Sequence, residues 1–483
     1  MSTYLFADHD EFVDRKDELE RIQRWWDDAR DPFPLMLYGR RRTGKSWLLR
    51  EFAHRKDADF FVCDSRAEGD QLAYFASVLG RSIGVVPALP DVRTFFDVLL
   101  RQPNARRRLV VIDELPLLLE QSRGADSSLA AVMEERESAA VKLVLCGSQV
   151  STMESLLGER ERAPLHGRAT PLSLAPLTFE TAREFLPGLR PEELITRFAI
   201  VGGMPLYLRR MARRASLKSV ICEEALSSLA PLHDEVREVL SMELPSTATY
   251  FSLLAALSRS SSLEWADLVQ RSHVEESIAS RYVRTLEDLR IVESANPAFA
   301  PPNARRRRYR VADQFVRFWF RFIFPFQADL SSGFRPGDHY DHNVEPFLAD
   351  HVAATFEDIC RAWVRSHFEV STVRAWWGLA RHDLRRRKTR TTEEIDVVGA
   401  HGRKVVVVGE CRWRSQRMGR DVLDDVVEYK LPALAQTGAD ISGVRVALFS
   451  RSGFRAELRE MAARRGDVVL VELADLAAWT APA

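Results

Sequence analysis

Short apolar runs alternate with amphipathic stretches through the first third of the chain. The runs have the length and the unbroken apolar character of strands buried on both faces of a sheet. Between them, apolar residues recur at helical spacing, as at Leu19, Ile22 and Trp26. This alternation predicts an α/β fold in which a parallel sheet is flanked by helices. The expected strands are residues 35–38, 59–63, 109–114 and 142–148.

The middle of the chain is predicted to be helical with a late turn. Residues 178–214 are polar and helix-rich, and Gly202-Gly203 followed by Pro205 fixes a tight bend. Three further segments with apolar residues at helical spacing precede a Pro-rich hairpin. These segments are residues 250–257, 263–269 and 276–289, and the third is expected to bury Ile278, Val283, Leu286 and Leu289.

The last third of the chain mixes helices and strands. A helix over residues 352–368 is followed by an expected hairpin that turns at Gly402. The Pro- and Gly-containing residues 334–341 are expected to form a linker. Strands at 394–398, 405–412, 444–450 and 468–471 and a helix at 421–434 predict a small mixed sheet. The patterns place domain limits at 1–177, 178–240, 241–330 and 331–483.

Composition narrows the class of protein. The 483 residues carry a formal net charge of zero, so no field of the whole molecule attracts nucleic acid. The five cysteines are scattered without a C-x-x-C pair, which argues against a disulfide framework or a zinc site and favours the cytoplasm. The most apolar segment, residues 315–326, is interrupted by Arg317 and Arg321, so no membrane segment is expected.

Residues 39–46, GRRRTGKS, have the G-x-x-x-x-G-K-[ST] spacing of a phosphate-binding loop. Its glycines let the backbone curl so that successive N–H groups face one anion, while Lys45 can reach the β- and γ-phosphates. The strand before the loop and the helix after it are the context that this motif requires. ATP and Mg²⁺ are therefore expected to bind through Gly39, Arg42, Thr43, Gly44, Lys45, Ser46 and Trp47, with Ser148 and Pro205 nearby.

Two acids end the strand of residues 109–114. Because open α/β sheets bind ligands at the carboxyl ends of their strands, Asp113 is expected to hold Mg²⁺ and Glu114 to polarise the attacking water. Ser148, at the end of the next strand, either senses the γ-phosphate or caps the following helix. Arg168 either stabilises charge on the γ-phosphate, from its own or a neighbouring subunit, or is simply solvated.

The middle and last domains carry further candidate sites. In the hairpin, Asp396 and Glu410 are expected to lie side by side, and Glu357 from the preceding helix completes a Mg²⁺ site. Three helices and a hairpin indicate a winged helix, which either reads DNA or packs on the nucleotide domain as a lever, with its arginines solvated or paired with acids. The expected DNA contacts are Arg281 and Arg284 on the third helix and Arg305, Arg306, Arg307 and Arg308 in the wing.

Six segments occur along the chain in this order: FVDRKDEL, GRRRTGKS, VVIDELP, LVLCGS, PLHGR and GGMPLYL. On these segments the chain resembles the archaeal-type ATPases, within the STAND branch of the AAA+-related P-loop proteins. The resemblance extends through EID at 394–396 and GECRW at 409–413 and so covers essentially the whole chain. It implies a P-loop ATPase core, a helical lid, a winged helix and a domain similar to PD-(D/E)XK nucleases. That nuclease pattern has a lysine two places after the glutamate, where this chain has Arg412, which cannot give up a proton.

The combined prediction is a cytoplasmic, Mg²⁺-dependent ATPase whose nucleotide state controls a winged helix and a nuclease-like domain that acts on DNA. A rival interpretation is an ATP-bound signalling or scaffold switch with an inactive C-terminal domain that binds a protein partner, which Arg412 favours. A third is a defence-type effector whose nuclease is active only in a homo-oligomer, with Arg168 acting across subunits.

Overall fold

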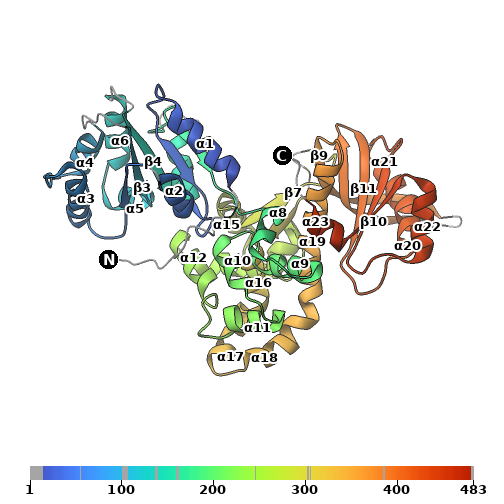
Figure 1. The fold of residues 1–483 in the computed structure, drawn as a ribbon. Coiled ribbons are helices and arrows are strands. Elements are labelled where there is room, and N and C mark those ends of the chain that lie inside the picture. The colour runs from blue at the N-terminus through green and yellow to red at the C-terminus, as the bar shows by residue number, and fades with distance from the viewer. Residues whose placement is uncertain are drawn as a thin grey trace. The chain divides into compact units, whose positions relative to one another are not determined.

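The computed structural model describes residues 13, 15–54, 56–100, 107–135, 140–158, 163–244, 246–301, 304, 306–384 and 387–479, without side chains over 381–391 (Figure 1). Two compact units are formed: unit 1 is Met1–Leu177 with Met204–Leu206, and unit 2 is Thr178–Gly203 with Tyr207–Ala483. The chain therefore passes from one unit to the other on both sides of Met204–Leu206. None of the helices in the described ranges is both long and apolar enough to cross a membrane.

Unit 1 is built on a five-stranded parallel sheet with the order β2-β3-β4-β1-β5. β4 lies between β1 and β3, with Leu35 opposite Val144 and Arg108 opposite Val141. Because all five strands run the same way, the segments that follow β1, β3 and β4 meet at one edge of the sheet. The predicted fold class is confirmed. The strands are β1 (Leu35–Tyr38), β2 (Ala58–Val62), β3 (Arg108–Asp113), β4 (Val141–Gly147) and β5 (Thr170–Ser173).

Alternate residues of these strands belong to two cores, one on each face of the sheet. Leu37 and Val111 pack with α1 and α2, whereas Met36 packs with helices from α3 to α7. α1 buries Trp25, so the predicted inward position of Trp26 is only half-buried. The helices are α1 (Lys16–Asp27), α2 (Lys45–Ala53), α3 (Glu68–Ile83), α4 (Val92–Leu100), α5 (Leu115–Gln121), α6 (Ala125–Glu134) and α7 (Val150–Leu157).

Unit 2 begins with short helices that a buried arginine holds together. Arg197 of α9 donates to the carbonyls of Arg213 (2.9 Å) and Ala215 (2.7 Å) and pairs with Glu193. A buried guanidinium is tolerated here because its charge has a carboxylate partner and its N–H groups find acceptors. The elements are α8 (Phe179–Ala182), η2 (Arg183–Phe185), α9 (Pro191–Val201), α10 (Pro205–Met211), α11 (Leu217–Ile221), η3 (Cys222–Leu226) and α12 (Glu235–Glu243).

Three helices and a small antiparallel sheet of order β6-β8-β7 follow. α15 buries Ala279, Val283 and Leu286, which follow an i, i+4, i+7 stripe, and it leaves Ile278 39% exposed. The predicted inward position of Ile278 is therefore wrong, since Ala279 occupies that place on the stripe. The elements are α13 (Thr247–Ser258), β6 (Leu263–Glu264), α14 (Trp265–Ser272), α15 (Glu276–Asp288), β7 (Val292–Ala295) and β8 (Arg308–Val311).

Helices continue where the sequence predicts a linker. Residues 334–341 include α18 and lead through η5 into the long α19, and His339 is fully buried and hydrogen-bonds the Phe322 carbonyl (2.8 Å). The linker prediction is wrong because Pro336 stands in the first turn of a helix, where its missing N–H costs no hydrogen bond. The elements are α16 (Gln314–Phe322), η4 (Phe324–Phe326), α17 (Gln327–Ser331), α18 (Pro336–His339), η5 (Tyr340–Val344) and α19 (Glu345–His367).

The last sheet has the order β13-β12-β11-β10-β9 and is mixed. β9, β10 and β11 are antiparallel, whereas β11, β12 and β13 are parallel. Val397 pairs with Gly409 across the hairpin, as the turn at Gly402 predicts. The elements are β9 (Thr372–Leu384), β10 (Arg387–His401), β11 (Lys404–Arg412), α20 (Arg420–Asp425), η6 (Val426–Lys430), α21 (Leu431–Ala435), β12 (Arg445–Ser450), α22 (Ala456–Arg465), β13 (Val468–Glu472) and α23 (Leu473–Ala478).

Candidate functional site

The predicted phosphate loop joins β1 to α2 in a curled conformation. Gly44 has φ 93° and Arg42 has φ 70°, in the left-handed region that residues other than glycine rarely adopt. A Cβ atom at Gly39 would collide with the carbonyl oxygen of Leu174, so glycine is required there by space. Pro205, which belongs to unit 1, lies beside Gly44, with its Cγ 3.7 Å from the point where a Cβ would stand. This curled backbone is the geometry that an anion-binding loop needs.

Lys45 is buried at the first position of α2. Its Nζ donates to the carbonyl oxygens of Gly39 (2.7 Å) and Arg40 (2.9 Å). Burial lowers the pKa of the Lys45 ammonium, and the carboxylates of Glu114 and Asp113 act in the opposite direction. Two neutral acceptors thus hold the ammonium over the loop, and a phosphate oxygen offers a stronger, charged one.

A hydroxyl and a carboxylate meet beside the loop. The Oγ of Ser46, in the first turn of α2, donates to Oδ2 of Asp113 at the end of β3 (2.7 Å). Hard oxygen donors of this kind are the ligands that Mg²⁺ prefers, usually one or two from protein with water and phosphate oxygens as the rest. The two side chains therefore fit a magnesium ion that accompanies a bound nucleotide. Thr43, Ser46 and Trp47 lie where the motif places them: Thr43 is fully buried, Trp47 is half-buried and Ser46 is exposed.

Glu114 is oriented by Ser148. Its backbone adopts a left-handed φ of 56°, and its Oε2 accepts from the Ser148 N–H (3.2 Å) and hydroxyl (2.7 Å). The Nη1 of Arg41 lies 4.0 Å from Oε1. The N-cap of α7 is Gln149, without a side-chain cap, so the structure uses Ser148 to fix the carboxylate and not to cap the helix. The strand order explains this contact, because β4 lies next to β3.

Arg15 supports the loop from behind, a role that the sequence did not reveal. Its guanidinium donates to the carbonyls of Thr43 (3.2 Å) and Ala175 (2.7 Å) and pairs with Glu18 (2.8 Å). Arg15 is buried and has φ 68°, just before α1. The signal that the sequence offered was an arginine inside the FVDRKDEL segment, just ahead of the expected helix.

Arg168 lies at the opposite edge of the sheet from the phosphate loop of its own chain. It precedes Thr170, the first residue of β5, and β5 runs parallel to β1, so Arg168 is at the amino ends of the strands. Its Nη1 pairs with Glu134 at the end of α6. The two residues line a recess of about 500 Å³ that also includes His166. The part of the prediction in which Arg168 serves its own subunit is therefore not met.

Three acids near the C-terminal sheet have raised pKa values: Glu357 of α19, Asp396 of β10 and Glu410 of β11. Burial, reinforced by the charge of Asp396, raises the pKa of Glu357 to about 8 and that of Glu410 to about 7. Burial also raises the pKa of Asp396, against the hydrogen bond that its Oδ2 accepts from the Cys411 N–H (2.8 Å). Even so, within the described ranges no group of three or more His, Cys, Asp or Glu side chains is placed to hold a metal ion. The expected metal site of Glu357, Asp396 and Glu410 is not assembled in this structure.

Two cations occupy the oxygens of Glu410. Lys430 Nζ, from η6, lies 2.6 Å from Oε2, and Arg412 Nη2 lies 2.7 Å from Oε1. The Glu410 side chain is 3% exposed, so the pair of cations compensates for the loss of hydration of its charge. Sequence reasoning missed Lys430, because the segment between residues 410 and 430 carries no signal of where η6 packs. A lysine is therefore present at the acid although the strand itself has arginine.

The side chain of the wing residue Arg308 is engaged inside unit 2. Arg308 pairs with Glu394 (2.7 Å), and its guanidinium carbon lies 4.5 Å from the centre of the Trp377 ring. The Trp377 indole donates to the Arg306 carbonyl (3.0 Å), and Arg307 is half-buried. Arg308 therefore fits the alternative in which wing arginines pair with acids, and not the one in which they are free to contact phosphates. Arg305 lies outside the described residues, and Arg281 and Arg284 are exposed on α15.

The fold and the loop define a P-loop ATPase, and comparison with known families agrees. Residues 12–211 match a family model described as an ATPase domain predominantly from Archaea. Residues 319–422 match a family of archaeal and bacterial proteins of unknown function. The predicted archaeal-type ATPase domain and the ATPase class are confirmed.

Among individual relatives, the uncharacterized protein MJECL04 of Methanocaldococcus jannaschii is 24% identical over 426 residues, which cover 85% of this chain and 89% of that protein. The uncharacterized ATP-binding protein MJ0423 of the same organism is 44% identical over 45 residues, 9% of this chain and 75% of its own. Among solved structures, the Walker-type ATPase PABY2304 of Pyrococcus abyssi shares 17% identity with a TM-score of 0.47, over 65% of this chain and 97% of its own.

Proposed function

We propose that this protein is an Mg²⁺-dependent ATP-binding and ATP-hydrolysing switch whose nucleotide state controls a winged helix and a C-terminal domain that acts on DNA. The observation that carries the proposal is the convergence of Lys45, Ser46, Asp113 and Glu114 at one edge of the parallel sheet. In it, Lys45 and the loop N–H groups bind the phosphates, and Ser46 and Asp113 hold the metal ion that neutralises phosphate charge. Glu114, oriented by Ser148, accepts a proton from the attacking water.

Nucleotide state reaches unit 2 through the segment Met204–Leu206. This segment belongs to unit 1, places Pro205 beside Gly44, and is continuous in both directions with unit 2. A bound phosphate that reshapes the loop around Gly44 therefore acts on a point where the chain leaves unit 1. The switch needs a difference in contacts between the two nucleotide states, and Pro205 is the residue proposed to provide it.

Support for the DNA-acting part comes from the order of elements in unit 2. Helix, strand, two helices and a two-stranded hairpin follow one another from α13 to β8, as in a winged helix. Arg281 and Arg284 are exposed on α15, in the position of a recognition helix. In the C-terminal domain, Lys430 is proposed to supply the amine that the nuclease pattern has on the strand, since its Nζ bonds Glu410.

The second candidate is an ATP-bound signalling or scaffold switch whose C-terminal domain is inactive and binds a protein partner. It is favoured by the engagement of both Glu410 oxygens and by the absence of a three-acid metal group among the described residues. Mg²⁺-dependent cleavage of plasmid and single-stranded DNA by the wild type, and its loss in Asp396→Ala, separates the candidates. Wild-type protein that cleaves neither substrate at any nucleotide state favours the second.

Nucleotide binding is tested first, because both candidates depend on it. Lys45→Ala is expected to abolish the heat of ATP binding in the presence of Mg²⁺, since no other side chain of the loop reaches the phosphates in the motif. Lys56→Ala, on the chain just after α2 and outside the loop, is the matched control and should bind ATP as the wild type does. Equal binding by Lys45→Ala and the wild type contradicts the proposal.

A proposed second role of Arg168, across subunits of a homo-oligomer, requires the ATPase rate per chain to rise with protein concentration.

A further inference from the structure

We propose that a recess between the wing hairpin and the C-terminal sheet binds the phosphate backbone of single-stranded DNA. The inference deepens the DNA-acting part of the proposed function and rests on it. In this inference DNA is not contacted by a freely exposed wing. It is contacted in a recess that the wing hairpin and the C-terminal sheet line together. The recess lies within unit 2 and measures about 480 Å³.

The lining of the recess suits phosphate oxygens more than apolar groups. Its walls come from β7, β8, α19, β9 and β10, and its apolar side chains are three alanines, a valine and the Trp377 indole. The donors are guanidinium groups together with serine hydroxyls, including Ser261 and Ser262. Three glutamates also line the recess, and each is paired with one of its arginines: Glu293 with Arg310, Glu357 with Arg361 and Glu394 with Arg308. Arginine and serine are the side chains that contact the sugar–phosphate backbone in protein–DNA complexes. The volume is sufficient for a single nucleotide.

Arg374 of β9 is the cation available to a ligand. Its side chain is exposed and makes no hydrogen bond or ion pair within the residues that the structure describes. The neighbouring Arg310 and Arg361 are committed to Asp358, at 2.8 Å and 2.6 Å. A phosphate that enters the recess therefore meets an arginine that has no acid partner among the described residues.

Arg308 is the second cation, held in a fixed orientation. Its guanidinium stacks on Trp377, whose indole N–H is tied to the backbone of Arg306. Its acid partner, Glu394, is 48% exposed, and an ion pair with so exposed a partner contributes little to stability. A phosphate replaces that carboxylate at little cost, and planar bidentate contact with a phosphate is what a guanidinium favours. Arg374 and Arg308 thus form a two-point phosphate site next to Glu357, which also lines the recess.

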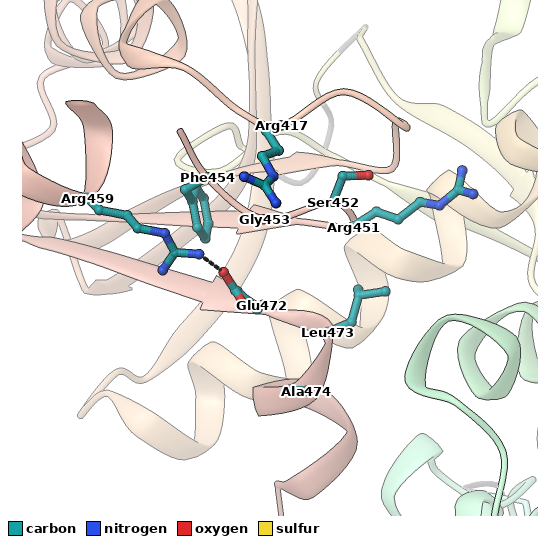
Figure 2. Close-up of a pocket in the computed structure, with 9 residues that line it drawn as sticks. All are labelled: Arg417, Arg451, Ser452, Gly453, Phe454, Arg459, Glu472, Leu473 and Ala474. Carbon is teal, nitrogen blue, oxygen red and sulfur yellow. Dashed lines mark hydrogen bonds and ion pairs between the residues drawn. The ribbon is translucent and has the colours of Figure 1, made fainter. Parts of the chain in front are cut away.

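A second arginine-lined recess provides the matched control. Arg417, Arg451 and Arg459 line a separate pocket of about 340 Å³ at the carboxyl ends of β12 and β13 (Figure 2). Figure 2 shows Arg459 paired with Glu472, and Arg451 is paired with Glu192. Arg417 is exposed and, like Arg374, has no hydrogen bond or ion pair among the described residues. Arg417→Gln therefore removes the same charge from the surface of the same domain without touching the proposed site.

The test is fluorescence anisotropy with a labelled 20-nucleotide oligo(dT), without ATP or Mg²⁺, at several salt concentrations. Arg374→Gln is expected to weaken binding about tenfold, as loss of one charge-assisted hydrogen bond does, and to lower the salt slope by about 0.7. Arg374→Gln/Arg308→Gln should weaken it further, while Arg417→Gln keeps wild-type affinity. Thermal unfolding of each variant at the wild-type temperature excludes loss of fold. That result is expected for Arg374→Gln and Arg417→Gln, because neither side chain has a hydrogen bond or ion pair among the described residues.

Several outcomes overturn the inference. One such outcome is that Arg374→Gln binds DNA with wild-type affinity while Arg281→Gln/Arg284→Gln loses affinity. That result keeps DNA as the ligand but assigns its binding to α15. Equal losses in Arg374→Gln and Arg417→Gln reduce the effect to general surface charge. If polyglutamate displaces the labelled oligo(dT) as effectively as unlabelled oligo(dT) does, the recess binds acidic peptides instead of DNA. No wild-type binding rejects both the recess and DNA as the target, and leaves the ATP-binding part of the proposal untouched.

Discussion

Glu114→Gln is expected to separate ATP binding from ATP hydrolysis. Glutamine keeps an oxygen that accepts from the Ser148 N–H and hydroxyl, so the side chain stays in place. The pair with Arg41 that is lost spans 4.0 Å between side chains that are 25% and 24% exposed, and such a pair contributes at most about 1 kcal/mol. The fold and the affinity for ATP should therefore change little.

The catalytic cost is much larger. Glutamine cannot accept the proton of the attacking water, and a general base typically contributes about 10²- to 10⁴-fold to a rate. At about 1.4 kcal/mol per tenfold, kcat should fall by the equivalent of roughly 3–5 kcal/mol. About a quarter of the Glu114 side chain is exposed, so in the variant a solvent water can accept the proton in place of the carboxylate. We therefore expect a loss of kcat near the lower limit, about 10²-fold.

Calorimetric titration with ATP and Mg²⁺, together with steady-state phosphate release, measures the two effects separately. Glu120→Gln makes the same change on an exposed carboxylate of α5, the helix that follows Glu114, and should leave both measurements at wild-type values. A kcat of Glu114→Gln within threefold of the wild type would falsify the assignment of Glu114 as the base. Loss of ATP binding in the same variant would show instead that the carboxylate supports the loop.

Three further outcomes are expected. Gly39→Ala should weaken ATP binding by calorimetry, because the added methyl group meets backbone that cannot move aside as a side chain can; unchanged affinity contradicts the geometry. Lys430→Met should abolish Mg²⁺-dependent DNA cleavage on plasmid gels, and adding Arg412→Lys to this variant should restore it. In both variants a cation remains at Glu410, but only the double variant has an amine there. Glu357 has a pKa of about 8 in the folded protein against 4.5 ordinarily, so the folded state holds this proton more tightly and loses stability as pH rises through that window. The stability advantage of Glu357→Gln over the wild type in urea unfolding should therefore grow from about pH 5 to about pH 8, and a constant difference would contradict it.

The sequence alone determined the phosphate loop and the strands around it. A local motif carries its own geometry: the glycines at 39 and 44 permit the turn, and the apolar run before them can only be a buried strand. The acids at the end of β3 follow the same logic, because parallel strands deliver their carboxyl ends to one edge. Periodicity also placed the hairpin around Gly402 and so set Asp396 near Glu410.

Contacts between segments distant in sequence were decided only by the tertiary structure. Nothing local predicts that Lys430 reaches Glu410, that Arg15 bonds the Thr43 carbonyl, or that Arg308 stacks on Trp377. Each contact depends on how one element packs against another, and a charged residue has the same local pattern whether it ends in solvent or beside an acid. The linker expected at 334–341 failed for a related reason, since proline in the first turn of a helix and proline in a loop look alike until the packing of the helix is known.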